Sequence, residues 1–262
     1  MKFFTYLADR LILQPTTHYV DPEELKRLAI VTPSGEVEAW TTSSEANSSS
    51  SSKVLLLKFP GTGGRAERSG LHPGDAWPDV SCVSWTINHR GYGGSQGPAT
   101  IQNFAETCDS VYSAAAELFP QHKIVVYGNS LGCLSALYVS ARFPVAGAYI
   151  RNPPPLAQMI ATRPRYTWWS LGLSRLIANQ VPSTLDSIKN ARRTNCPVLF
   201  IQSELDRVIP THYQELIIEQ FGGAVRKLVL RGADHHHRAA ESQLEEYTDA
   251  VRWLGNRVTP NS

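Results

Sequence analysis

The sequence lacks several features that would assign it to a class at once. It has four cysteines in 262 residues and no C-x-x-C pair, which disfavours a zinc site and a small disulfide scaffold. We expect buried free thiols in a reducing compartment at Cys82, Cys108, Cys133 and Cys196. Lysine and arginine are scattered and the net charge is +2, so the basic stripe typical of nucleic-acid binding is missing.

A long apolar run is also missing from the N-terminal end. Residues 1–13 are largely apolar, but Asp9 and Arg10 interrupt them. The segment is too short to cross a bilayer, and no small-residue cleavage site follows it. We therefore expect an amphipathic segment that packs on the domain, a cytoplasmic location and no stable insertion into a membrane.

What is present is the composition of an ordinary globular domain. The chain is 42% hydrophobic and 18% charged, which suffices to bury a full central sheet. We expect one domain over residues 1–262. Its first part reads as a hairpin over residues 28–41, with the turn at Pro33, Ser34 and Gly35.

Behind the hairpin, apolar runs of strand length alternate with segments of helical periodicity. Thr100 has the residue type of a helix N-cap, and apolar residues follow it at helical spacing until Pro120. The expected strands cover residues 54–59, 80–87, 124–127, 145–150, 198–202 and 227–230, and two further helices cover 131–142 and 239–254. This alternation predicts an α/β fold, a three-layer α/β/α sandwich with a mostly parallel central sheet of about eight strands.

Two copies of G-x-S-x-G offer a nucleophile, Ser130 in residues 128–132 and Ser95 in residues 93–97. The first copy follows the strand 124–127 directly and opens a helix, which is the strand–turn–helix context of a nucleophile elbow. The second copy lies in a glycine-rich loop followed by Pro98, with no apolar strand entering it. Context therefore favours Ser130 as the nucleophile.

A serine nucleophile needs a base and an acid that orients the base. Asp206 follows the strand 198–202 and is the preferred acid, with Glu204 as the alternative. His235 follows the last strand and is the preferred base, with His236 as the alternative. A metal bound by His235 and His237 is the competing interpretation, but no carboxylate or cysteine cluster accompanies them, so no metal is expected.

An oxyanion needs backbone N–H donors as well. The residue after the nucleophile, Leu131, supplies one at the start of a helix. The glycine-rich loop at residues 60–64 supplies the second, and Thr62 is the expected donor. The alternative is that residues 60–64 form an ordinary glycine turn.

With these residues placed, the chain resembles the α/β-hydrolase serine hydrolases, which include esterases, lipases, thioesterases and peptidases. The resemblance covers about residues 54–254 and rests on the segments 60–64, 88–95, 128–132, 206–210 and 232–235. Two positions depart from the family pattern. Pro60 replaces the histidine that usually opens and buttresses the oxyanion loop, and Asn88 stands where many relatives have Asp.

Family resemblance also implies a small helical lid at residues 153–195, an apolar and aromatic segment. Simple packing of these side chains on the core is the alternative. The expected substrate contacts are Met159, Tyr166, Trp168, Trp169 and Arg151. Arg151, Arg163 and Arg165 could also grip a carboxylate, although exposed arginines are usually only solvated.

The resulting hypothesis is a carboxylesterase-like serine hydrolase without a cofactor, acting on a small-molecule ester, thioester or amide through an acyl-enzyme on Ser130. Transfer of the acyl group to an alcohol or amine is a second hypothesis, since the same triad serves both reactions. A non-catalytic ligand-binding protein on a hydrolase scaffold is the third. Dehalogenase or epoxide hydrolase chemistry is disfavoured, because those relatives carry Asp at the elbow.

Overall fold

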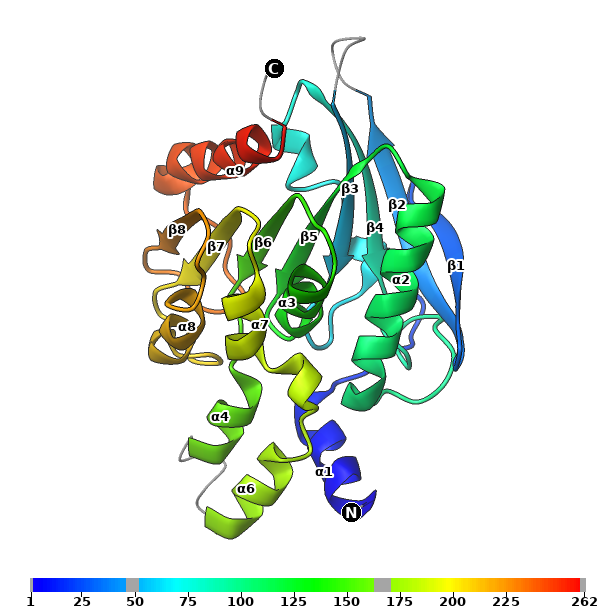
Figure 1. Cartoon of the computed structure of the whole chain (residues 1–262), viewed down its shortest axis with the longest axis vertical. Helices are drawn as coiled ribbons and strands as arrows, with labels where there is room; N and C mark the ends of the chain where they lie inside the picture. Colours follow the sequence, from blue (N-terminus) through cyan, green and yellow to red (C-terminus); the bar gives the residue numbers. More distant parts are fainter. Residues whose placement is uncertain (1, 46–51, 163–170, 260–262) are drawn as a thin grey trace.

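The computed structural model describes residues 2–45, 52–162 and 171–259. Its centre is a sheet of eight strands in the order β1-β2-β4-β3-β5-β6-β7-β8 (Figure 1). The strands are β1 (Lys26–Thr32), β2 (Gly35–Ser44), β3 (Ser52–Phe59), β4 (Val80–Ile87), β5 (Lys123–Asn129), β6 (Gly147–Arg151), β7 (Val198–Ser203) and β8 (Val225–Leu230). β1 and β2 are antiparallel to their neighbours, and β3 to β8 run parallel, so the predicted sheet is confirmed.

Helices cover both faces of the sheet. On one face lie α2 (Phe104–Leu118), α3 (Gly132–Arg142), α7 (Ser187–Arg193) and α8 (Thr211–Ile218). On the other face lies α9 (Leu244–Val258), which contacts β6, β7 and β8. The central strands have buried side chains on both faces, as in β3 from Val54 to Phe59, and such doubly covered strands read as continuous apolar runs.

The starts of two helices were predicted wrongly. The last helix was expected to begin at residue 239, but a 3₁₀ turn forms at Glu241–Gln243 and α9 begins at Leu244. The other is the helix expected after Thr100. Residues 101–103 form a 3₁₀ turn instead of the first turn of the helix, and the Thr100 side chain makes no capping hydrogen bond. The helix α2 begins at Phe104 and ends at Leu118. Its end before Pro120 agrees with the steric restriction that proline imposes on the preceding residue.

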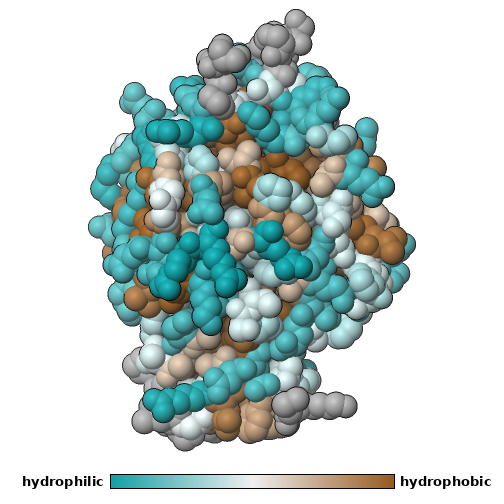
Figure 2. All heavy atoms as spheres, in the orientation of Figure 1, coloured by the Kyte–Doolittle hydropathy of each residue, from teal (hydrophilic) through white to brown (hydrophobic). Residues whose placement is uncertain are grey.

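The N-terminal segment forms α1 (Lys2–Ile12), and it packs on the domain as predicted, with Ala8 and Leu13 buried in the core. α1 lies beside α6 (Leu171–Ala178), which contacts α4 (Leu156–Thr162), and the three helices lie together at the lower end of Figure 1. Apolar side chains reach the surface at this end (Figure 2). Within the described residues, no helix is long and apolar enough to cross a membrane.

Candidate active site

Ser130 lies in the sharp turn between β5 and α3. Its φ of +53° is in the left-handed region, which a non-glycine residue adopts only when its surroundings impose it. The turn depends on small neighbours, because a Cβ on Gly132 would lie 1.9 Å from the Phe59 carbonyl oxygen. The Ser130 N–H donates to the Arg151 carbonyl oxygen at 2.8 Å, which anchors the turn to β6.

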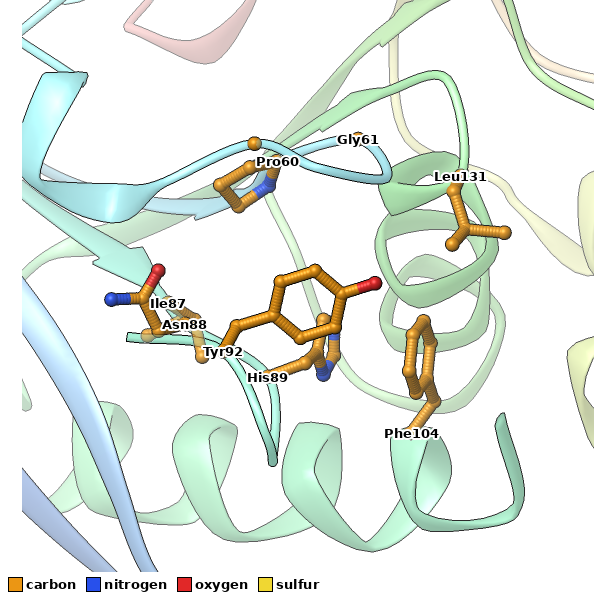
Figure 3. Close-up of a pocket in the computed structure, with 9 residues that line it drawn as sticks. Pro60, Gly61, Ile87, Asn88, His89, Tyr92, Phe104 and Leu131 are labelled. Carbon is orange, nitrogen blue, oxygen red and sulfur yellow. The ribbon is translucent and has the colours of Figure 1, made fainter. Parts of the chain in front are cut away.

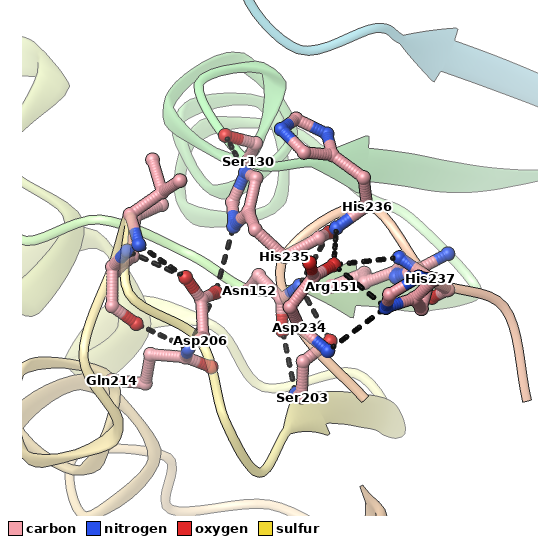
Figure 4. Close-up of polar contacts among 12 residues, drawn as sticks. Ser130, Arg151, Asn152, Ser203, Asp206, Gln214, Asp234, His235, His236 and His237 are labelled. Atoms are coloured by element: carbon pink, nitrogen blue, oxygen red, sulfur yellow. Dashed lines mark hydrogen bonds and ion pairs between the residues drawn. The ribbon is translucent and has the colours of Figure 1, made fainter. Parts of the chain in front are cut away.

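The structure brings Ser130, His235 and Asp206 into one hydrogen-bonded row (Figure 4). His235 Nε2 lies 2.9 Å from Ser130 Oγ, and His235 Nδ1 lies 2.7 Å from Asp206 Oδ2. The three residues are at most 7% exposed. These neighbours assign the proton of the neutral ring to Nδ1, which leaves Nε2 to accept from the hydroxyl.

The Asp206 carboxylate is held by several donors besides His235. Its Oδ1 accepts from the N–H groups of Val208 and Ile209, at 2.8 and 2.7 Å. Its Oδ2 also accepts from Gln214 Nε2 at 3.3 Å. These donors fix the carboxylate in the orientation that meets Nδ1 of His235.

The alternative acid and base lie elsewhere. Glu204 is exposed and its carboxylate accepts from the Gly232 N–H at 2.7 Å. His236 is exposed, and the exposed His237 ring lies 3.0 Å from Asp234. No group of three or more potential metal ligands occurs within the part of the chain that the structure describes.

Ser95, the serine of the second G-x-S-x-G copy, makes hydrogen bonds that stabilise the fold. Its Oγ donates to the Asn88 carbonyl oxygen at 2.6 Å and accepts from the Glu38 N–H at 2.8 Å. Both partners are backbone groups, and neither histidine nor carboxylate contacts the hydroxyl in the described residues. The hydroxyl is therefore occupied in joining β2 to the loop after β4.

The loop of residues 60–64 was predicted to supply an oxyanion donor and is hereafter called the oxyanion loop for that reason. It lies against the serine. A Cβ on Gly61 would lie 3.1 Å from the Ser130 Cβ, so only a glycine allows this approach without displacement. Among the described residues, neither the Leu131 N–H nor the Thr62 N–H has a hydrogen-bond acceptor. The Thr62 hydroxyl is engaged, since it accepts from the Gln14 N–H at 3.0 Å and donates to the Ile12 carbonyl oxygen at 3.2 Å.

A cavity of about 10 Å³ lies beneath this loop, bordered by Gly61, Leu131, His89, Tyr92 and Phe104 among others (Figure 3). A space of this size holds roughly one water molecule. The His89 ring stacks on Phe104 with 3.9 Å between ring centroids, and burial lowers its pKa to about 3. His89 is therefore a neutral packing residue under the loop.

Sequence reasoning missed Asn152, which follows β6 and is fully buried. Its φ is +48°, and its Oδ1 accepts from the Ser203 N–H at 2.8 Å. Its Nδ2 faces Ser203 Oγ at 3.0 Å and the His235 carbonyl oxygen at 3.4 Å. One amide thus joins the loops that carry the acid and the base. The signal for it in the sequence was a lone asparagine at the carboxyl end of a strand.

The expected substrate contacts are only partly described. Met159 is 5% exposed and packs with Ile209 and Tyr213, so it links α4 to the loop of Asp206. Arg151 is half-buried and one of its guanidinium nitrogens donates to the His237 carbonyl oxygen. Tyr166, Trp168 and Trp169, together with Arg163 and Arg165, lie outside the described residues.

Comparisons of this chain with a family model and with solved structures define its fold class. A family model described as the alpha/beta hydrolase fold matches residues 82–169. The chain superposes on the acylaminoacyl peptidase of Pyrococcus horikoshii with a TM-score of 0.69 at 12% identity, over 91% of this chain and 42% of that one. It superposes on the esterase Pf2001 of Pyrococcus furiosus with a TM-score of 0.66 at 15% identity, over 94% and 98% of the two chains. The chain has the α/β-hydrolase fold, as predicted.

Curated relatives carry the same fold name. The "Alpha/beta hydrolase domain-containing protein aho-3" of Caenorhabditis elegans is 24% identical over 176 residues, which cover 65% of this chain and 50% of the relative. "Alpha/beta hydrolase domain-containing protein 17C" of Homo sapiens is 22% identical over 188 residues, which cover 70% of this chain and 52% of the relative. The matched segment thus spans about half the length of these relatives.

Proposed function

We propose that this protein is a serine hydrolase that cleaves a carboxylic ester, or a related thioester or amide, through an acyl-enzyme. The observation that carries the proposal is the row Ser130–His235–Asp206, with distances of 2.9 and 2.7 Å at its two links. Nucleophile, orienting acid and base follow one another along the chain as Ser130, Asp206 and His235, which is the order that this fold uses. The esterase and peptidase structures that share the fold support a hydrolase.

In the first step, Ser130 Oγ forms a bond to the carbonyl carbon while its proton passes to His235 Nε2. Asp206 remains ionised and stabilises the imidazolium through Nδ1–H. The N–H groups of Leu131 and Thr62 donate to the carbonyl oxygen as it gains negative charge. The bond to the leaving alcohol then breaks, the alcohol takes the proton from His235, and the acyl group stays on Ser130.

In the second step, water attacks the acyl carbon with His235 again as the base. The bond to Ser130 Oγ breaks and the serine regains its proton from His235, which releases a carboxylic acid. Every proton moves among Ser130, His235, the leaving alcohol and water, so the cycle balances without a cofactor or a metal ion.

Within residues 153–195, we also propose that the part before α7 acts as a lid, since α7 itself packs against α3 in the helical layer that covers the sheet. The described part of this segment includes α4 and α6, and residues 152–155 connect the carboxyl end of β6 to α4. Met159 of α4 packs against Ile209, whose N–H holds the Asp206 carboxylate. Such a cover would exclude water and present an apolar wall to the acyl group.

The test is the variant Ser130→Ala. Turnover of short p-nitrophenyl esters should fall by at least about 10⁴-fold, and labelling by a fluorophosphonate probe should vanish, because Ser130 is the only serine of the described residues that is paired with His235. Ser113→Ala is the matched control, since Ser113 is exposed on α2. Persistent labelling of Ser130→Ala would overturn the assignment of the nucleophile.

A further inference from the structure

Two departures from the family pattern meet at the oxyanion loop. The loop must hold the Thr62 N–H near Ser130, yet the Pro60 side chain has no hydrogen-bonding group that could hold the loop in place. The Gly64 N–H donates to the Gly61 carbonyl oxygen at 2.9 Å, which closes the turn, and the chain then continues into Arg65, Ala66 and Glu67. Contacts that hold residues 65–67 in place therefore also hold the oxyanion loop in place.

They are fixed by the side chain of Asn88, which is 1% exposed at the end of β4. Asn88 Oδ1 accepts from the Ala66 N–H at 2.9 Å. Its Nδ2 donates to Glu67 Oε2 at 2.9 Å and to Glu38 Oε2 at 2.7 Å. The amide orientation is unambiguous, because a backbone donor faces one end and two carboxylates face the other.

The charges around Asn88 balance only because Asn88 is neutral. The two carboxylates, Glu38 and Glu67, are paired with two guanidinium groups, Arg27 at 2.8 Å and Arg65 respectively. Burial acts to raise the pKa of Glu38, but hydrogen bonds from the Gly94 N–H, Arg27 and Asn88 outweigh it and hold the pKa below its ordinary value. An aspartate at position 88 would face two carboxylates and would lose both donated hydrogen bonds.

The glycines of the loop after β4 make room for this network. A Cβ on Gly93 would lie 2.2 Å from Asn88 Nδ2, and one on Gly94 would lie 2.6 Å from Glu38 Oε1. The Gly94 N–H also donates to Glu38 Oε2 at 2.8 Å. The glycine-rich stretch, which has no part in the proposed chemistry, is thus explained by the packing around Glu38 and Asn88.

We propose that Asn88 is a positioning residue for the oxyanion loop, whose neutral amide ties Ala66 and Glu67 to Glu38 of β2 and replaces the buttress missing at Pro60. The inference rests on the proposed function, because it assigns a catalytic consequence to the place of the Thr62 N–H. The same contacts would also stabilise the fold, so the test needs a readout beyond stability.

The variant Asn88→Asp keeps the shape of the side chain and its acceptor for Ala66, but it removes the donors and adds a charge. We expect kcat for a short p-nitrophenyl ester to fall by roughly 10- to 100-fold at pH 8 with KM changed less than about threefold, since an oxyanion donor acts in the transition state. As the pH falls, the introduced carboxylate takes up a proton and can donate again. The ratio of variant to wild-type kcat should therefore rise toward one, because any pH dependence that the two proteins share cancels in this ratio.

Asn256→Asp is the matched control, because Asn256 is exposed on α9 and the change in charge is the same. A folded Asn88→Asp protein with wild-type kcat at pH 8, or a kcat ratio that does not change with pH, would overturn the inference. If Asn88→Asp does not fold, the variant Glu67→Gln tests the inference in its place. A lowered kcat at unchanged KM would support the inference, and an unchanged kcat would overturn it. A wild-type protein that neither turns over esters nor reacts with the probe overturns the proposed function, and this inference with it.

Discussion

At the residue scale, neighbouring groups hold the residues of the candidate site in fixed conformations. Ser130 is held in a left-handed turn, and the Asp206 carboxylate accepts from four donors, the N–H groups of Val208 and Ile209 and the side chains of Gln214 and His235. Such preorganisation is what a proton transfer between fixed partners requires. Asn152 contributes to it by linking the loop of Asp206 to the loop of His235.

The variant Asn152→Asp tests this link. It keeps the acceptor for the Ser203 N–H but removes the donor that faces Ser203 Oγ and the His235 carbonyl oxygen. We expect kcat to fall by about tenfold or more with little change in KM, because small displacements of reacting groups cost large factors in rate. Steady-state kinetics and a pH–rate profile measure this. Asn195→Asp, at an exposed position, is the control, and equal kcat in the two variants would contradict the role of Asn152.

At the element scale, the N-terminal helix is connected to the site. Asp9 of α1 accepts from the Ile101 N–H at 3.0 Å, and Thr5 donates to Gln180 at 2.8 Å. Ile12, the last residue of α1, and Gln14 just beyond it hold the hydroxyl of Thr62 in the oxyanion loop. An element remote in sequence from the three site loops therefore supports one of the expected oxyanion donors.

Replacing the fully buried Ala8 should separate α1 from the domain. Ala8→Glu places a charge in the core, so we expect the free energy of unfolding to fall by roughly 2–3 kcal/mol. Hydrogen exchange should accelerate in α1 and at the Gln14 N–H, which donates to the Thr62 hydroxyl, while β5 stays protected, and kcat should fall with the loosened loop. Leu11→Glu is the matched control on the same helix, since Leu11 is 49% exposed. Unchanged exchange in α1 of Ala8→Glu would contradict this prediction.

At the scale of the whole molecule, the buried His89 couples stability to pH. The pKa of its ring is about 3 in the folded protein because of burial, against an ordinary value of 6.5. The unfolded chain therefore binds a proton below pH 6.5 that the folded protein does not bind. This contribution to stability is complete above pH 6.5 and is lost as the pH falls from there toward 3.

The variant His89→Gln should show a weaker dependence of stability on pH. The wild-type free energy of unfolding should decline more steeply between pH 6.5 and 5, by up to about 1.4 kcal/mol per pH unit from this group. The variant itself should be less stable at pH 7, because it loses the stacking on Phe104. Urea unfolding at several pH values measures both effects. His212→Gln, at an exposed position, should keep the wild-type slope, and an identical slope in His89→Gln would refute the coupling.

Local patterns predicted much of the fold and the members of the candidate triad. Continuous apolar runs indicated the strands, because helices bury both faces of the sheet. The G-x-S-x-G pattern between a strand and a helix indicated the turn of Ser130. The prediction failed at Thr100, where a capping residue type was present but a 3₁₀ turn formed. Residue type at a helix start is a weak signal when packing determines where the first turn lies.

What the sequence determined by itself was the order of strands and helices and the residue types at the ends of the strands, since these follow from hydrophobic periodicity and turn chemistry. Only the tertiary structure decided which polar residues meet. Asn152 reaches Ser203 across 51 residues, and Asn88 reaches Glu38 across 50. Single buried amides leave no periodic trace in a sequence, and their partners are chosen by strand order and by the need to satisfy every buried donor and acceptor.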